Sequence, residues 1–340
     1  MTLARTSKDR WCVVIADNHG SARFAVRDEL GEASVPMVHS RLGNTATLLQ
    51  EALQRATRIA QSSQVMVTTH EEYRPLWEPA LLFVRPEHRF IATSPEAATL
   101  TVATSILAIC KRSLSSIVVL LPAQCHIVQD AVVTSAIEHA CLLLPSVREG
   151  IITLGMGDIE DAPDEDYLIP DSARNDPTLE VLGLARRPTV WVARHLRDAG
   201  AMVASGILVG YAGVFAAHLS KYCPGLAAQL EQTSTAAADT GNECDVALHE
   251  LPRLPRLALA ALTWRPPILR QRALCVWSSG WNGLRSPRSI ERLVRHYGVK
   301  ESPQTSPRRV PIYIAPECES PVAQNTHAQG RSATVVTGPR

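Results

Sequence analysis

The stretch Trp11-Cys12-Val13-Val14-Ile15-Ala16 runs directly into Asp17-Asn18-His19-Gly20. Six apolar residues followed by four turn-forming ones predict a buried strand that ends in a loop. Similar apolar runs recur downstream and alternate with segments of helical spacing. This alternation predicts an α/β fold with a Rossmann-like, mostly parallel sheet flanked by helices. Ligands of such sheets bind beyond the carboxyl ends of the strands, so the loops after Ala16, Leu121 and Ala185 are the ones to inspect.

The same patterns give the order of elements along the chain. Apolar runs predict strands at 65–69, 117–121, 151–155 and 179–185, and helical spacing or apolar content predicts helices at 48–60, 97–111, 131–144 and 286–297. The stretch Ala199–Leu219 has no Asp, Glu, Lys or Arg and is long enough to span a bilayer. Because four glycines interrupt it, we interpret it as a buried strand, a turn and the start of a helix.

Composition limits the possible functions only broadly. The 340 residues are 46% hydrophobic and 20% charged, with a net charge of +1, so we expect an ordered chain with no nucleic-acid partner. The eight cysteines are scattered, without the spacing of a zinc site, and are typical of reduced core residues. Because no apolar run follows the basic N-terminus, we expect no secretory signal and no membrane partner, and a cytoplasmic location.

Four segments are expected. Residues 1–10 form an N-terminal tail, and 11–232 form the main domain. Residues 233–300 complete the same domain after a small, polar linker at Thr233–Asn242. Residues 301–340 are rich in Ser, Pro, Thr and Arg, which predicts a disordered tail.

From about Trp11 to Gly298 the chain resembles the sugar-1-phosphate nucleotidyltransferase family, in particular its mannose-1-phosphate guanylyltransferase branch. The family's opening loop A-G-G-x-G-T-R resembles Ala16–Ala22, and its P-K-Q-F and L-L-Q-x-x-L-x-R-A resemble Pro36-Met37 and Leu48–Ala56. Further pieces follow in the family's order. P-E-N-R, L-P-S-D-H, V-x-x-F-V-E-K-P, W-N-S-G-I-F and W-x-D-x-G-x-P resemble 86–89, 121–125, 181–188, 203–208 and 281–287.

The resemblance implies a nucleotide-diphospho-sugar transferase fold and the reaction of GTP with mannose-1-phosphate to give GDP-mannose and pyrophosphate. The implied partners are a nucleoside triphosphate, GTP being favoured, and a sugar-1-phosphate. Mg²⁺ is implied as cofactor if the protein is active. The implied nucleotide contacts are Ala16, Gly20, Ser21, Arg23, Arg89, Pro122 and Gln124. The implied sugar-phosphate contacts are Arg187, Ser205 and Gly206.

The chain departs from the family at its charged positions. Met37 stands at the phosphate-binding Lys, Ala22 at the Arg, and Gln124 and Gly283 at the two metal-binding Asp positions. Asp17 and Asn18 replace two glycines of the first loop, Arg186 replaces a Glu and Ala204 replaces an Asn. Neither an amide nor a hydrogen atom substitutes for a carboxylate in holding a hard divalent cation. We therefore predict no metal-binding residue and weak or lost catalysis, and the catalytic residues stay unknown.

Two functions stay open. The chain is either a weakened or residual enzyme of this type, or a non-catalytic nucleotide-binding or regulatory partner that associates with itself or with an active nucleotidyltransferase. A metal-free transferase using the same pocket is a third, weaker idea. Relocated carboxylates would favour an enzyme, and the sequence offers four near the first loop and the Leu121 strand: Asp17, Asp28, Glu29 and Asp130.

Several residues also have plain structural interpretations. Arg23 and Arg89 are typical of solvated surface arginines, and Gly20-Ser21 of an ordinary turn. The acidic run Asp158–Asp166 is typical of a solvated loop rather than a metal site. Cys125 and His126 are candidates for a thiol nucleophile and a base, with an inert thiol and a loop histidine as the alternatives. Arg253–Arg272 is expected to form an amphipathic surface.

Overall fold

The computed structural model describes residues 9–16, 25–27, 34–42, 46–94, 97–147, 149–159, 162–171, 176–222, 241–246 and 270–297. Ten strands of the described chain form one sheet, in the order β12-β5-β4-β1-β6-β11-β8-β13-β10-β9. Their bounds are β1 Arg10–Ile15, β4 Val65–His70, β5 Arg89–Ala92, β6 Ile117–Pro122, β8 Gly150–Met156, β9 Tyr167–Pro170, β10 Leu179–Ala185, β11 Met202–Tyr211, β12 Cys244–Val246 and β13 Arg270–Val276.

The sheet is mixed, which corrects the prediction of a mostly parallel one. From β12 to β6 every neighbouring pair is parallel. Beyond β6, β11 runs antiparallel to β6, β8 and β9, and β13 pairs parallel with β8 but antiparallel with β10. The half of the sheet from β12 to β6 therefore has the parallel pairing expected from the sequence, and the half from β11 to β9 combines parallel and antiparallel pairs.

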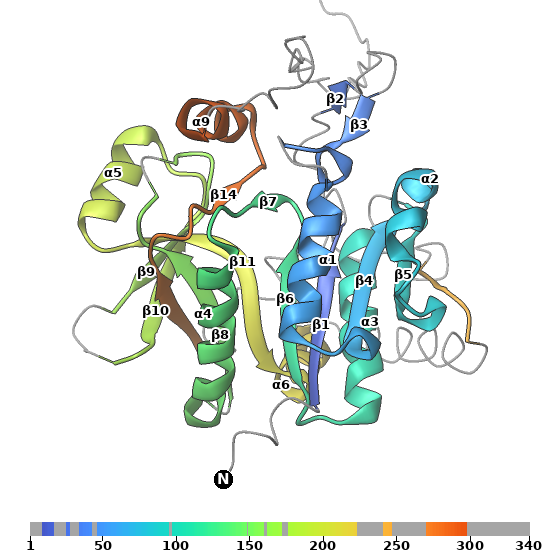
Figure 1. The fold of residues 1–340 in the computed structure, drawn as a ribbon. Coiled ribbons are helices and arrows are strands. Elements are labelled where there is room, and N and C mark those ends of the chain that lie inside the picture. The colour runs from blue at the N-terminus through green and yellow to red at the C-terminus, as the bar shows by residue number, and fades with distance from the viewer. Residues whose placement is uncertain are drawn as a thin grey trace, which may run out of the picture.

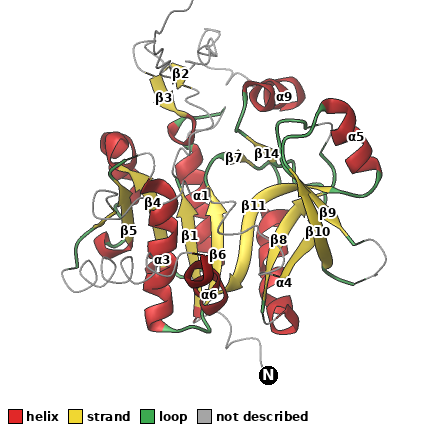
Figure 2. Cartoon of the chain, turned by 180° about the vertical axis from the view of Figure 1, so that it is seen from behind, coloured by secondary structure: helices red, strands yellow, loops and turns green. Residues whose placement is uncertain are grey.

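Helices cover both faces of the sheet (Figures 1 and 2). The longer helices are α1 Leu48–Ile59, α3 Ala98–Arg112, α4 Asp130–Leu143, α5 Val190–Asp198, α6 Ala212–Tyr222 and α9 Pro287–Tyr297. Shorter elements are α2 Arg74–Trp77, the strand pairs β2 Ala25–Arg27 with β3 Ser34–Pro36 and β7 Cys125–His126 with β14 Asn282–Gly283, and 3-10 turns at 37–39, 62–64, 71–73, 78–81, 86–88 and 144–147.

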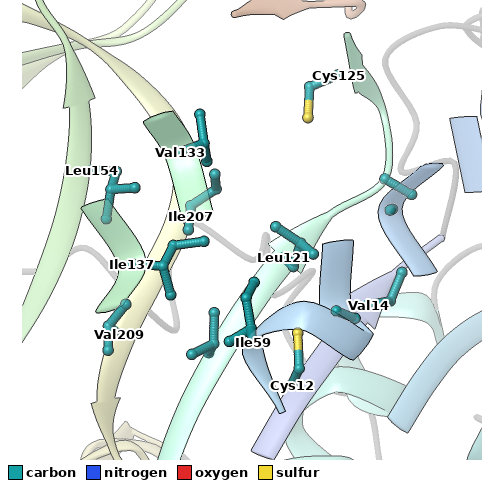
Figure 3. Packing of buried hydrophobic residues seen from close by; sticks show 14 of the residues in the cluster. Cys12, Val14, Ile59, Leu121, Cys125, Val133, Ile137, Leu154, Ile207 and Val209 are labelled. Atoms are coloured by element: carbon teal, nitrogen blue, oxygen red, sulfur yellow. The ribbon is translucent and has the colours of Figure 1, made fainter. Parts of the chain in front are cut away.

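The side chains of β1 alternate between two hydrophobic clusters, as the twofold period of a strand requires. Cys12 and Val14 face the cluster that contains α1 and α4, part of which Figure 3 shows. Trp11, Val13 and Ile15 face the cluster on the other side, with α3 and α6. A strand that is buried on both faces is apolar along its whole length, which is why the sequence predicts β1 so clearly.

Two predictions about apolar segments can now be compared with the structure. The stretch 199–219 forms β11 and the first part of α6, as expected. Within the described residues, Asp130–Val147, which includes α4, has the length and composition of a membrane-spanning segment. Because Val133, Ile137, Ala140 and Cys141 pack in the sheet's core cluster, α4 has the contacts of a core helix.

The predicted strands and helices are otherwise confirmed to within two residues. In the large sheet, strands β5, β9, β12 and β13 were not predicted, and neither were helices α2 and α5 nor the two short strand pairs β2–β3 and β7–β14. Strand β13 lies inside the sheet and includes Arg270–Arg272, which were assigned to an amphipathic surface. Of the predicted N-terminal tail, residues 1–8 lie outside the described residues and Arg10 begins β1. The C-terminal tail, most of the linker and most of 253–272 also lie outside the described residues.

Candidate functional site

The carboxyl end of β6 lies against the short strand pair β7–β14, which crosses above the sheet (Figure 1). Strand β6 ends at Pro122, and the Nε2 atom of Gln124 donates a hydrogen bond of 2.6 Å to the backbone oxygen of Leu284. The backbone N–H of Leu284 in turn donates to the backbone oxygen of Gln124, at 3.3 Å. The amide of Gln124 therefore holds the segment after β14 in place.

Strand β11 bulges where it passes the end of β6. Its pairing with β8 shifts between Ala204 and Leu208. Within the bulge the Ser205 hydroxyl donates to the oxygen of Leu154 at 2.7 Å and accepts the backbone N–H of Ile207 at 3.0 Å. Gly206 has a φ of 79°, a conformation that favours glycine. Ser205 thus stabilises the bulge, and Gly206 lets the backbone approach the site closely.

The turn before β9 brings acidic side chains into the same region. Glu165 is completely buried, so the prediction that the acidic run lies on a solvated loop is wrong for this residue. Neither of its carboxyl oxygens has a hydrogen-bond partner among the described residues. Burial raises the pKa of Glu165 to about 7, and the positive charge of Arg285 opposes this rise.

Glu165 lies directly against Gly283. A Cβ atom added to Gly283 would collide with the Oε1 atom of Glu165 and would lie 2.8 Å from the ring of Trp281. The carboxyl group thus fills the space that any side chain at position 283 would need. The resemblance assigns a metal-binding Asp to this position, and the structure puts a carboxyl group from another element beside it.

Asp164 and Asp166 flank this carboxyl and are both engaged. Asp164 is 3.3 Å from the Nη1 atom of Arg292 on α9 and accepts the hydroxyl of Ser286. Asp166 accepts the backbone N–H of Arg187 at 3.2 Å, and its backbone oxygen accepts the N–H of Ala204. These contacts tie the turn to α9, β11 and the loop after β10.

The implied nucleotide and sugar-phosphate residues are not all brought together. Pro122, Gln124, Ser205 and Gly206 meet where the carboxyl end of β6 passes the bulge in the first half of β11. Arg187 follows β10 in a left-handed conformation, with a φ of 39° that is uncommon for a residue with a side chain. Ala16 is buried directly after β1, where its N–H donates to the oxygen of Thr68 at 2.9 Å. Gly20, Ser21 and Arg23 lie outside the described residues, as do Asp17, Asp28 and Glu29.

Arg89 is neither solvated nor directed to a ligand. Its guanidinium donates to the backbone oxygens of Leu81 and Val84 and pairs with Glu243 at 3.0 Å. Only 12% of the side chain is exposed, so the interpretation as a surface arginine is wrong. These contacts join β5 to the segment before β12, which gives Arg89 a structural role.

Asp130, the candidate relocated acid after β6, is also engaged in ion pairs. Asp130 accepts a 2.5 Å hydrogen bond from the Nε atom of Arg55 and pairs with Arg58. It therefore joins the start of α4 to α1.

Met37, at the family's Lys position, is fully buried in a cluster with Leu48, Leu284, Ile290 and Leu293. The position that would hold a phosphate-binding Lys instead anchors the C-terminal helix.

The two side chains of β7 do not form an activated pair. Burial raises the pKa of the Cys125 thiol, which leaves it protonated at neutral pH. Burial also lowers the pKa of His126, whose Nδ1 atom lies 4.0 Å from Glu51. Both residues fit the interpretation as structural groups of β7.

The residues at the metal positions do not fit a magnesium ion. The Nε2 atom of Gln124 faces a backbone oxygen, Gly283 has no side chain, and Glu165 is a single acid pressed against that glycine. In the part of the chain that the structure describes, no three His, Cys, Asp or Glu residues are grouped as a metal would require. Oxygen ligands are what Mg²⁺ needs, and the described site provides too few of them.

No known family model matches the chain, and no curated protein is similar to it in sequence. Solved structures share its fold. A mannose-1-phosphate geranyltransferase from Thermus thermophilus superposes with a TM-score of 0.62 and 14% identity, over 84% of this chain and 79% of that one. A mannose-6-phosphate isomerase from Helicobacter pylori gives 0.56 and 13%, over 80% of this chain and 98% of the other. Since identity is this low, what the chain shares with these two proteins is their fold.

Proposed function

We propose that this chain is a nucleotidyltransferase-like protein that binds a nucleoside triphosphate and a sugar-1-phosphate, and in which metal-dependent nucleotidyl transfer is weak or lost. GTP and mannose-1-phosphate are the favoured ligands, because the sequence motifs resemble that branch of the family. The fold shared with two proteins named for mannose phosphates supports the same choice.

One observation carries the loss of catalysis. An amide, Gln124, and a glycine, Gly283, stand where the resemblance expects the two metal-binding Asp residues, and the amide is hydrogen-bonded to Leu284. Losing the charge stabilisation of a metal ion raises a phosphoryl-transfer barrier by several kcal/mol, and each 1.4 kcal/mol or so is tenfold in rate. The buried Met37 removes a further cation from the place where the family holds a phosphate.

The test is purified protein with Mg²⁺ and a panel of nucleoside triphosphates and sugar-1-phosphates, scored in parallel for pyrophosphate release and for thermal stabilisation. We expect stabilisation by one of these ligands with little or no pyrophosphate release, since a ligand that prefers the folded state raises its stability. Turnover at ordinary enzyme rates would refute the loss of catalysis. A panel without any binding would refute the proposed function as a whole.

A further inference from the structure

A single guanidinium group lies where the strand ends of the site meet. Arg285 follows Leu284, which Gln124 holds through the two hydrogen bonds described above. A Cβ atom placed on Gly206 would be 3.0 Å from the Nη2 atom of Arg285 and 3.0 Å from the Cγ atom of Pro122. The guanidinium therefore lies beside the bulge of β11, next to the space that a side chain at position 206 would occupy.

The donors of Arg285 are available to a ligand. No hydrogen bond or ion pair within 4 Å joins this side chain to the part of the chain that is described, whereas Arg292 is bound to Asp164 and Asn282. Arg285 is also partly exposed, so a solute can reach it. A guanidinium has five N–H donors in a rigid fork that matches two oxygens of a phosphate group.

The acids around this cation are engaged with other groups. The groups that act electrostatically on Glu165 are Arg285, Asp164, Arg292 and Asp166, and the last three have the partners described above. Glu165 is completely buried and its oxygens accept no hydrogen bond from the described residues, but its Oε1 atom lies 4.0 Å from the Nη2 atom of Arg292. A bound phosphate group would accept hydrogen bonds from the guanidinium of Arg285 while the carboxyl group of Glu165 stays buried.

We infer that Arg285 is a resident cation of the site that binds a phosphate group of the ligand without a metal ion. This inference rests on the proposed function and goes beyond it, because it names the residue whose positive charge pairs with the phosphate group. The ligand chemistry is a phosphate or diphosphate group, which a nucleotide, a sugar phosphate or free pyrophosphate can supply. The arginine replaces the metal in binding and supplies no activated nucleophile.

The experiment measures binding of inorganic pyrophosphate, GTP and mannose-1-phosphate by calorimetry at pH 8, in EDTA and in Mg²⁺. We expect the wild-type protein to bind at least one of them equally well in both buffers. Arg285→Gln should weaken that binding about tenfold or more, the usual effect of removing a charge-assisted hydrogen bond. Arg288→Gln is the matched control, because Arg288 is exposed on α9 and lies outside the site; its affinity should equal that of the wild type. Which of the three ligands responds identifies the source of the phosphate group.

Glu165→Gln provides a second arm that does not depend on the folding of the Arg285 variant. Removing the buried negative charge beside the guanidinium should tighten binding several-fold at pH 8, since the anion no longer competes with a carboxylate. Binding that requires Mg²⁺, equal affinity in Arg285→Gln, or no tightening in Glu165→Gln would each overturn the assignment. These results would leave the proposed function intact, which fails only if none of the ligands binds in either buffer.

Discussion

The buried carboxyl of Glu165 should make the stability of the fold depend on pH in a direction opposite to that of most acids. Its pKa rises from 4.5 to about 7 on folding, chiefly through burial. Below pH 4.5 the group is protonated in both states and the fold carries no penalty. As the pH rises towards 7 the unfolded chain ionises first, so stability falls, and above 7 the penalty is constant. The rise in pKa corresponds to about 3 kcal/mol.

Glu165→Gln removes the titrating group and keeps its shape. Urea unfolding of both proteins between pH 4.5 and 8.5 should show the variant gaining stability relative to the wild type as the pH rises, by about 3 kcal/mol in all, or roughly 5 °C in Tm for a chain of this size. The difference between the two proteins is the quantity to measure. Burial lowers the pKa values of His39 and His88 to about 4, so these residues destabilise both proteins alike as the pH falls. A difference that stays constant over this range, or that favours the wild type at pH 8, would refute the argument.

Three further substitutions test single contacts. Asp130→Asn should cost about 3 kcal/mol in urea unfolding, because it leaves the buried guanidinium of Arg55 without its carboxylate; a loss below about 1 kcal/mol would contradict the pairing. Arg89→Met should lower stability by about 1 to 3 kcal/mol, since three backbone and carboxylate contacts are lost, and should leave nucleotide affinity unchanged. Met37→Lys should destabilise the fold by several kcal/mol and restore no pyrophosphate release, because it puts an ammonium group into an apolar cluster; recovered turnover would show that the position faces the site.

The strands and helices were largely predictable because their signal is local. The run Trp11–Ala16 is apolar on both faces, since β1 packs between two hydrophobic clusters. The direction of the strands was not predictable in the same way. Whether β11 runs parallel or antiparallel to β6 is decided by the path of the chain between them, and nothing in the apolar pattern of 202–211 records it. Strand β13 was not predicted because it begins with three polar residues, one of which, the buried Gln271, donates from its Nε2 atom to the hydroxyl of Thr153 on the neighbouring strand.

Part of the site was predictable for the opposite reason. The motif resemblance located Gln124, Gly206 and Gly283 from segments far apart in the chain, and the fold brings them to one edge of the sheet. Glu165 and Arg285 were missed, because an acidic run and an arginine after a glycine are ordinary surface patterns in a sequence. A side chain at position 283 would collide with Glu165, and only the structure shows that an Asp at 283 and Glu165 would need the same space.

This competition ties the changes in the site together. With Glu165 in place, restoring an Asp at Gly283 would bring two carboxylates into contact in a buried region, where like charges do not both ionise. With Arg285 beside Gly206, a divalent cation at the same edge would face a positive charge. We therefore expect neither Gln124→Asp nor Gly283→Asp alone to give Mg²⁺-dependent pyrophosphate release, because Glu165 and Arg285 act electrostatically on each other and on any charge added beside them. Pyrophosphate release by either single variant would contradict this coupling.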